Sequence, residues 1–368
     1  MKAKKQLNFI DRLILWINIL LCIALLISYL APITNPEKIW IIAFFGLAYP
    51  FLLLGNVILI LYWLIRKSKF VFLSLIVIAV GWNVLNKNIG LRFNSSSDSR
   101  PLNNLRMMTY NVHNFKRYGA KNDISTKHEI LTIISQEQPD IIGFQEFYTR
   151  RHGQYDMLDS IQKILNCNSY YFEAARSNKD EAIGIALFSK YPIVAHGFIQ
   201  LADRSSENQC LYIDVKKGEK TIRVYSVHLQ SIGFEQEDYR YLNSVSQEGK
   251  ADVSSTKRLG SKLKTAFAKR SEQVFKVKGH ADACPYPYII SGDFNDTPTS
   301  FAVNRMCKGL KNAFREKGSG LGRTYNGSFP NYQIDYIMAS PQFDVTGYNI
   351  TEKRLSDHYP VRSDLVLK

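Results

Sequence analysis

Residues 291–298, with the sequence Ser-Gly-Asp-Phe-Asn-Asp-Thr-Pro, place a carboxylate and a carboxamide two residues apart. They follow the apolar run 288–290, which predicts a buried strand closed by turn residues. At the end of a strand, Asp293 can hold or deprotonate a water, and the Asn295 amide can donate to an oxyanion. The same pattern is also ordinary turn chemistry, because both side chains hydrogen-bond their own backbone. The rest of the chain decides between these two interpretations.

Six further polar residues lie where other predicted strands end or begin. Three of them end strands, and the other three begin or precede strands. If the later strands run antiparallel to the earlier ones, all of these side chains gather at one rim. A helix cap, a satisfied core histidine or a turn would explain any one of them, but their joint occurrence favours a shared site. In chain order they are Asn111, Glu146, His228, Asp335, Asp357 and His358.

These residue types suit phosphate chemistry around a divalent cation. Mg²⁺ prefers a few carboxylates together with water and phosphate oxygens. A histidine that works near pH 7 needs a carboxylate to fix its tautomer. A metal and hydrogen-bond donors would neutralise the charge that develops in an in-line displacement.

The elements that must position these residues predict an α/β fold. Strands in long runs, with helices at irregular intervals, indicate two packed mixed β-sheets flanked by helices. Residues 230–256 are polar and lack periodicity, so a lid, a substrate-reading insertion and disorder all stay open. Helices are predicted over 125–137, 155–165 and 259–278. Strands are predicted over 105–111, 140–146, 170–173, 184–189, 198–201, 211–216, 221–228, 288–290, 333–339, 343–348 and 361–367.

Residues 1–93 contain three long apolar runs, at 13–31, 39–65 and 70–85. At about 1.5 Å per residue, the first run reaches across the roughly 30 Å hydrocarbon core of a bilayer. A cleaved signal peptide explains this run poorly, because its apolar region is too long and two more runs follow. We therefore expect a membrane domain of three transmembrane helices, of which the third is the shortest.

The loop charges predict the orientation of these spans. Lys and Arg are frequent before the first run and after the second, which places both segments in the cytoplasm. An odd number of spans then puts the rest of the chain on the exoplasmic side of the cell membrane, periplasmic or extracellular. If the third run does not cross the membrane, the rest of the chain after it lies in the cytoplasm instead.

A small polar linker at 94–101 separates the membrane domain from a second domain at 102–368, and its composition predicts few contacts across the boundary. Ten Lys and Arg and three Asp and Glu lie before residue 100, so the remainder carries a net charge of +8. This charge suits an anionic substrate or lipid headgroups, but it forms no polybasic nucleic-acid stripe. The five cysteines include no Cys-x-x-Cys pair, which makes a zinc site improbable and favours buried free thiols.

The motifs over residues 105–367 resemble the endonuclease/exonuclease/phosphatase superfamily, whose members include deoxyribonuclease I, abasic-site endonucleases, neutral sphingomyelinases and inositol-polyphosphate phosphatases. The apolar runs lie outside this resemblance. Supporting positions are Arg270, Gln273, Gly184 and the stretch Ser189-Lys190-Tyr191-Pro192. The motifs themselves are Thr109-Tyr110-Asn111, Gln145-Glu146, His228-Leu229, Gly292-Asp293-Phe294-Asn295, Ile334-Asp335-Tyr336 and Ser356-Asp357-His358.

The resemblance implies a four-layered α/β sandwich and a Mg²⁺-dependent phosphoester hydrolase, with Mn²⁺ able to substitute. It makes Glu146 the principal metal ligand, with Asn111 beside it and Asp357 close enough to influence metal or water.

The resemblance also implies roles for the remaining site residues. Asp335 would orient His358, and Asp293 would position or deprotonate the attacking water. Asn295 and His228 would hydrogen-bond the phosphoryl oxygens. Whether His358 acts as a base or as a phosphate-binding cation stays open.

The expected substrate is a lipid or another small phosphodiester or phosphomonoester. A tether beside a bilayer raises local access to lipid headgroups, and the acidic first half of 230–256 is poorly suited to clasping DNA. The alternative is a metal-dependent endonuclease or exonuclease acting on DNA or RNA. A binding module with a dead site is disfavoured, because no catalytic-type position is lost. The oligomeric state stays open.

Overall fold

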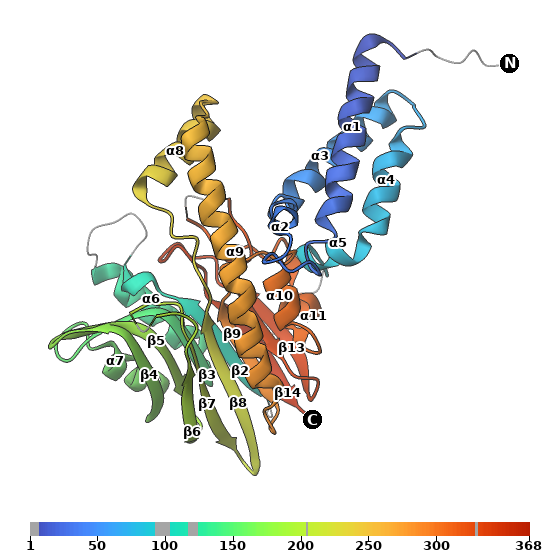
Figure 1. Ribbon diagram of the computed structural model, residues 1–368. Coiled ribbons are helices and arrows are strands. Elements are labelled where there is room, and N and C mark those ends of the chain that lie inside the picture. The colour runs from blue at the N-terminus through green and yellow to red at the C-terminus, as the bar shows by residue number, and fades with distance from the viewer. Residues whose placement is uncertain (1–6, 93–103, 117–123, 204, 328–329) are drawn as a thin grey trace.

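The computed structural model describes residues 7–92, 104–116, 124–203, 205–327 and 330–368 (Figure 1). The predicted linker at 94–101 lies outside these ranges. The described chain consists of an N-terminal group of helices and a larger unit of two sheets and flanking helices.

The larger unit contains two six-stranded mixed sheets. The first, in spatial order, comprises β13 (Phe343–Ile350), β14 (Val361–Leu367), β2 (Asn104–Asn111), β3 (Ile141–Arg150), β5 (Glu181–Ser189) and β4 (Ser169–Ser177). The second comprises β10 (Lys311–Asn312), β12 (Asp335–Ala339), β9 (Tyr288–Asp293), β8 (Lys220–His228), β7 (Cys210–Lys217) and β6 (Ile193–Ile199). Each sheet has one parallel pair, β2 with β3 and β8 with β9.

The two sheets pack face to face and carry helices on their outer faces, which confirms the predicted sandwich. Met107 and Leu187 of the first sheet share a buried cluster with Ile213 and Ile337 of the second. Helices α6 (Ile124–Glu137) and α7 (Met157–Leu165) pack on the outer face of the first sheet, and α9 (Val253–Asp282) and α10 (Phe301–Met306) on that of the second. Shorter elements are η1 (His113–Phe115), α11 (Ala313–Lys317), β1 (Gly90–Leu91) and β11 (Ser319–Gly320).

The strand predicted at 198–201 lies earlier, as β6. This strand is at the edge of its sheet, and its side chains are half-buried or exposed. Because it is not buried on both faces, its apolar pattern is weak and the sequence places it poorly.

Part of the polar segment 230–256 is helical. Helix α8 (Gln236–Glu248) begins with a capping box between Glu235 and Asp238, and α9 starts at Val253, earlier than the predicted residue 259. Asp238 is fully buried and accepts hydrogen bonds from Arg258 and Lys262 of α9. The apolar residues Tyr239 and Leu242 of α8 are only half-buried, and ion pairs contribute to its attachment, so its hydrophobic pattern is weak in the sequence.

The three predicted spans are only partly matched. Among the described residues, one unbroken helix, α1 (Phe9–Ser28), is long and apolar enough to cross a membrane. The second run is divided into α2 (Trp40–Leu47) and α3 (Tyr49–Ile65), bent by 56°, and the third into α4 (Val71–Val80) and α5 (Trp82–Asn88), bent by 73°. Proline at the start of α3 and Gly81 between α4 and α5 accompany these breaks. The number of spans reaches three only if each bent pair counts as one.

Helices α1, α3 and α4 lie side by side (Figure 1). Polar side chains are buried between them together with some apolar ones, and many large apolar side chains are exposed on the outside. Asn18, Asn56 and Ser74 are completely buried, and the Ser74 hydroxyl connects the other two at 2.7 and 2.8 Å. Large apolar side chains such as Leu20 and Leu61 are exposed. This distribution is the reverse of that in a water-soluble bundle.

The helical group contacts the sandwich more extensively than the linker composition predicts. The Ser271 hydroxyl of α9 donates to Asn35, and the ring of Phe267 meets that of Phe44 of α2 edge-on at 5.4 Å. Strand β1 pairs with β11.

The five cysteines are free, as expected.

Candidate active site

The sheet registers bring the predicted strand-end residues together. Asp293 is paired with His228 on the parallel strand β8 and with Asp335 on the antiparallel strand β12. In the first sheet, Asn111 lies opposite Gln145, one residue before Glu146. The antiparallel course of β12 therefore delivers Asp335 to the same rim as the carboxyl ends of the parallel strands.

A buried polar contact joins the two sheets just beneath this rim. The Gln145 amide donates to the Ser226 hydroxyl of the second sheet at 3.0 Å and to Thr109 at 3.2 Å. All three side chains are completely buried. Because buried hydrogen bonds are directional, this contact fixes how the two halves of the site face each other.

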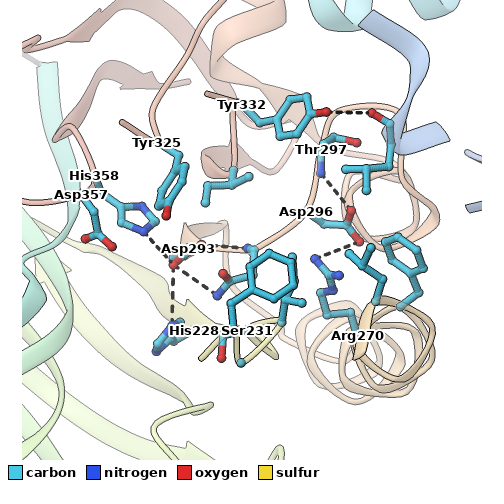
Figure 2. A pocket seen from close by; sticks show the side chains of 18 of the residues that line it. His228, Ser231, Arg270, Asp293, Asp296, Thr297, Tyr325, Tyr332, Asp357 and His358 are labelled. Carbon is cyan, nitrogen blue, oxygen red and sulfur yellow. Dashed lines mark hydrogen bonds and ion pairs between the residues drawn. The ribbon is translucent and has the colours of Figure 1, made fainter. Parts of the chain in front are cut away.

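Asp293 lies at the centre of the site, between two histidines (Figure 2). Its Oδ2 atom is 3.6 Å from Nε2 of His228 and 3.6 Å from Nε2 of His358. Asn111 donates to the same oxygen at 3.2 Å, and the backbone N–H of Asn295 donates to Oδ1 at 2.8 Å. Burial is the main cause that raises the pKa of Asp293, and the charge of His358 opposes it. A carboxylate with a raised pKa is a stronger proton acceptor than ordinary aspartate.

His358 is held by Asp335 as an imidazolium. Nδ1 of His358 is 2.9 Å from Oδ2 of Asp335, and both side chains are nearly fully buried. Burial lowers the pKa of His358, but the negative charges of Asp335 and Asp293 outweigh it and raise this pKa well above its usual value. The histidine therefore presents a cationic N–H donor, at Nε2, toward Asp293.

Glu146 lies in a β-bulge of β3, in a strained backbone conformation. The pairing of β3 with β5 shifts between Phe144 and Phe147, and Glu146 has φ of 51°. A non-glycine residue in this region costs free energy and is typical of functional positions. Burial raises the pKa of Glu146, but the hydrogen bond with His113 and the charge of His228 lower it to about 2.

His113 is a site residue that the sequence interpretation missed. Its Nδ1 atom is 3.4 Å from Glu146 and 3.7 Å from Asp357. The hydrogen bond to Glu146 is the main cause that raises the pKa of His113. The residue follows Asn111 by two positions, so its place just after a strand end was the signal that could have identified it.

The carboxylates of Glu146 and Asp357 and the amide of Asn111 suit a hard divalent cation. Mg²⁺ and Mn²⁺ favour such oxygen donors, and both carboxylates lie within 3.7 Å of Nδ1 of His113. A second group of ligand atoms, one each from Asp293, Asp335 and His358, lies within 4.8 Å of one another and could also hold a metal ion. In this second group, Nδ1 of His358 is already 2.9 Å from Asp335.

These residues surround a cleft of about 370 Å³. Six of the eight predicted site residues line it, whereas Asn111 and Asp335 lie behind them and contact Asp293 and His358. Apolar side chains from several parts of the chain also line the cleft. They include Leu47, Ile232, Phe234, Leu263, Phe267 and Ile334.

Two family models match the chain. The model described as "Endonuclease/Exonuclease/phosphatase family" matches residues 108–358, and a domain of unknown function matches residues 11–88. No curated protein matches.

Solved structures share the fold. An endonuclease/exonuclease/phosphatase from Beutenbergia cavernae has 22% identity and a TM-score of 0.53, over 73% of this chain and 72% of that one. A family protein from Bacteroides thetaiotaomicron has 19% identity and a TM-score of 0.50, over 72% and 98%. The human Nocturnin catalytic domain, with a bound sulfate anion, has 15% identity and a TM-score of 0.50, over 73% and 97%.

Proposed function

Because this chain belongs to the endonuclease/exonuclease/phosphatase family, we propose that it is a membrane-anchored, Mg²⁺-dependent hydrolase of a lipid or other small phosphoester. The observation that carries the proposal is the position of Asp293 between His228 and His358, beside Glu146. A proton acceptor, hydrogen-bond donors and a metal-suited carboxylate are the parts that phosphoester hydrolysis requires.

In the proposed mechanism, Asp293 accepts a proton from the water that attacks phosphorus. The bond from phosphorus to the leaving oxygen breaks as the new P–O bond forms, and the leaving oxygen takes a proton from solvent. His358 acts as a phosphate-binding cation and not as the base, since its pairing with Asp335 keeps it protonated. His228 and the Asn295 amide donate to the remaining phosphoryl oxygens. A metal held by Glu146, Asn111 and Asp357 would neutralise negative charge on the phosphate.

The membrane anchor is proposed from α1 and from the polarity of its neighbours. Apolar side chains cover the outside of α1, α3 and α4, and the buried Asn and Ser network connects them within. Such an arrangement suits a bilayer, where small and polar residues join helices. With three spans, the loop charges favour an exoplasmic catalytic unit.

A nuclease is the second candidate. Asp238 is one of the acidic residues that make the first half of 230–256 poorly suited to binding DNA. Its side chain is buried and is paired with Arg258 and Lys262. The objection based on the charge of 230–256 is therefore weaker than the sequence indicated.

A substrate panel tests these proposals. The full chain in vesicles should hydrolyse a lipid phosphodiester or a small phosphoester with Mg²⁺ or Mn²⁺, and a chelator should abolish the activity. The panel should comprise sphingomyelin, glycerophospholipids, inositol phosphates, plasmid DNA and abasic duplex. Faster cleavage of DNA than of every lipid and small ester would replace the first function by the second. Activity that survives chelation would contradict the metal requirement.

A further inference from the structure

A groove of about 540 Å³ lies between α3 and residues 321–323 and 330–333 of the catalytic unit. This volume is in the range of about 300–1,000 Å³ that is typical of small-molecule sites. Most of the groove's side chains are apolar. They include Tyr49, Phe51, Leu54, Val57, Leu321 and Tyr332.

Tyr332 lines both this groove and the active-site cleft. Its hydroxyl donates to the backbone carbonyl of Leu47 at 3.1 Å (Figure 2), and Leu47 itself lines the cleft. The groove and the cleft therefore share a wall, and the N-terminal helices build part of both. An occupant of the groove would lie next to a molecule bound at the reacting centre.

The groove is open along α3. Phe51, Leu54 and Val57 line it and are 56%, 56% and 40% exposed. They belong to the same outward-facing apolar surface that we assign to the bilayer. A hydrocarbon chain could thus pass from the membrane interior into the groove without crossing water.

We propose that this groove receives an acyl chain of a membrane phospholipid whose phosphate is bound in the cleft lined by Asp293 and His358. The inference rests on the proposed function and narrows its substrate to a lipid. The helices would then be part of the substrate-binding site as well as an anchor. Because Tyr332 lines both spaces, a chain in the groove and a phosphate in the cleft would be neighbours, which favours a chain attached to the reacting phosphoester over a separate protein partner.

The first test compares two substrates in the full chain, reconstituted in vesicles. One is a long-chain phospholipid and the other a water-soluble aryl phosphodiester. Leu54→Trp should fill the groove and lower the ratio of lipid to soluble-ester kcat/KM at least tenfold. Leu64→Trp is the matched control, since Leu64 is on the same helix, is 55% exposed and does not line the groove. The ratio should stay within twofold in this control.

The second test locates the chain directly and does not depend on turnover. A phospholipid with a diazirine in its acyl chain is photolysed with the Asp293→Asn protein in vesicles. Cross-links should map to peptides that contain Leu54 or Tyr332, and Leu54→Trp should reduce them at least fivefold. Cross-links spread evenly over α1, α3 and α4 would overturn the groove as a specific site. Cross-links to a second copy of the chain would assign the groove to self-association.

The two proposals fail in different ways. If the soluble ester is hydrolysed with metal but the ratio is unchanged in Leu54→Trp, only the acyl-chain groove is wrong. If neither substrate is hydrolysed with metal, the proposal of a lipid or small-phosphodiester hydrolase is wrong.

Discussion

Single residues around Asp293 determine which replacements should be most costly. Asp293→Asn removes the proton acceptor, and His358→Ala removes the cation held by Asp335 at 2.9 Å. Each change should lower kcat at least about a hundredfold, the scale for a positioned proton-transfer group. The loss of kcat in the double variant should be much smaller than the product of the two single losses, because both groups act in one step. Losses that multiply, or a His358→Ala enzyme within a few-fold of the parent, would contradict this arrangement.

Glu146 should behave differently, because its proposed role is in metal binding. Glu146→Gln keeps the size of the side chain but removes the negative charge that attracts a cation. The Mg²⁺ concentration for half-maximal rate should rise at least about tenfold, and excess Mg²⁺ should restore part of the rate. Glu129→Gln, at a surface pair with Lys353, is the control and should leave the metal titration unchanged. A Glu146→Gln enzyme that stays inactive at every metal concentration would argue for a direct chemical role.

The positions of individual site residues could be predicted only as far as strand ends could be recognised. Asp293, His228 and Glu146 follow apolar runs in the sequence, and the structure places all three in one cleft. The bulge that turns Glu146 to φ of 51° depends on pairing with a distant strand, so no local pattern indicates it. His113 was missed because it lies in a short 3₁₀ turn after the strand, not on the strand itself.

At the scale of elements, α8 depends on one buried carboxylate. Burial raises the pKa of Asp238, but the Glu235 backbone N–H, Lys262 and Arg258 together lower it to about 2. A carboxyl whose pKa is lowered on folding stabilises the fold above its unfolded pKa. That contribution is lost as the pH falls through the folded value. The attachment of α8 to α9 should therefore be complete above pH 4 and weaken toward pH 2.

Replacement of Asp238 tests this attachment. Asp238→Asn removes a charge that hydrogen-bonds two cations, an interaction of about 1.5–3 kcal/mol per bond. Amide hydrogens of α8 should exchange roughly tenfold faster or more at neutral pH. The control is Glu248→Gln, which removes only a surface pair with Lys250 and should have little effect. Equal exchange in the two variants would mean that apolar contacts, such as those of Tyr239, hold α8.

Sequence patterns predicted the elements well where these are buried among apolar side chains. They predicted them poorly where ion pairs or bends in the helices determine the structure. Strands β8 and β9 lie in the core and match their predicted positions within a few residues. Helix α8 buries no large apolar side chain completely, and its ion pairs with α9 become visible only in three dimensions. The breaks before α3 and α5 reflect local chain geometry that a hydropathy run averages away.

At the scale of the whole molecule, the proposed orientation is testable by a reporter. Alkaline phosphatase fused after Pro101 should be active, because it works only outside the cytoplasm and the loop charges place residue 101 there. A fusion after Lys69, in the positively charged loop after α3, should be inactive. An inactive fusion at residue 101 with an active cytoplasmic reporter at the same site would reverse the assignment.

The contact of α2 with α9 also has a kinetic consequence. The ring of Phe44 contacts the ring of Phe267, and the Tyr332 hydroxyl donates to the Leu47 carbonyl. These contacts keep the catalytic cleft next to the N-terminal helices. In a bilayer, enzyme and lipid would then meet by lateral diffusion in two dimensions. The rate should follow the mole fraction of substrate in each vesicle, falling on surface dilution with inert lipid at constant bulk concentration. Substrate confined to separate vesicles should be spared.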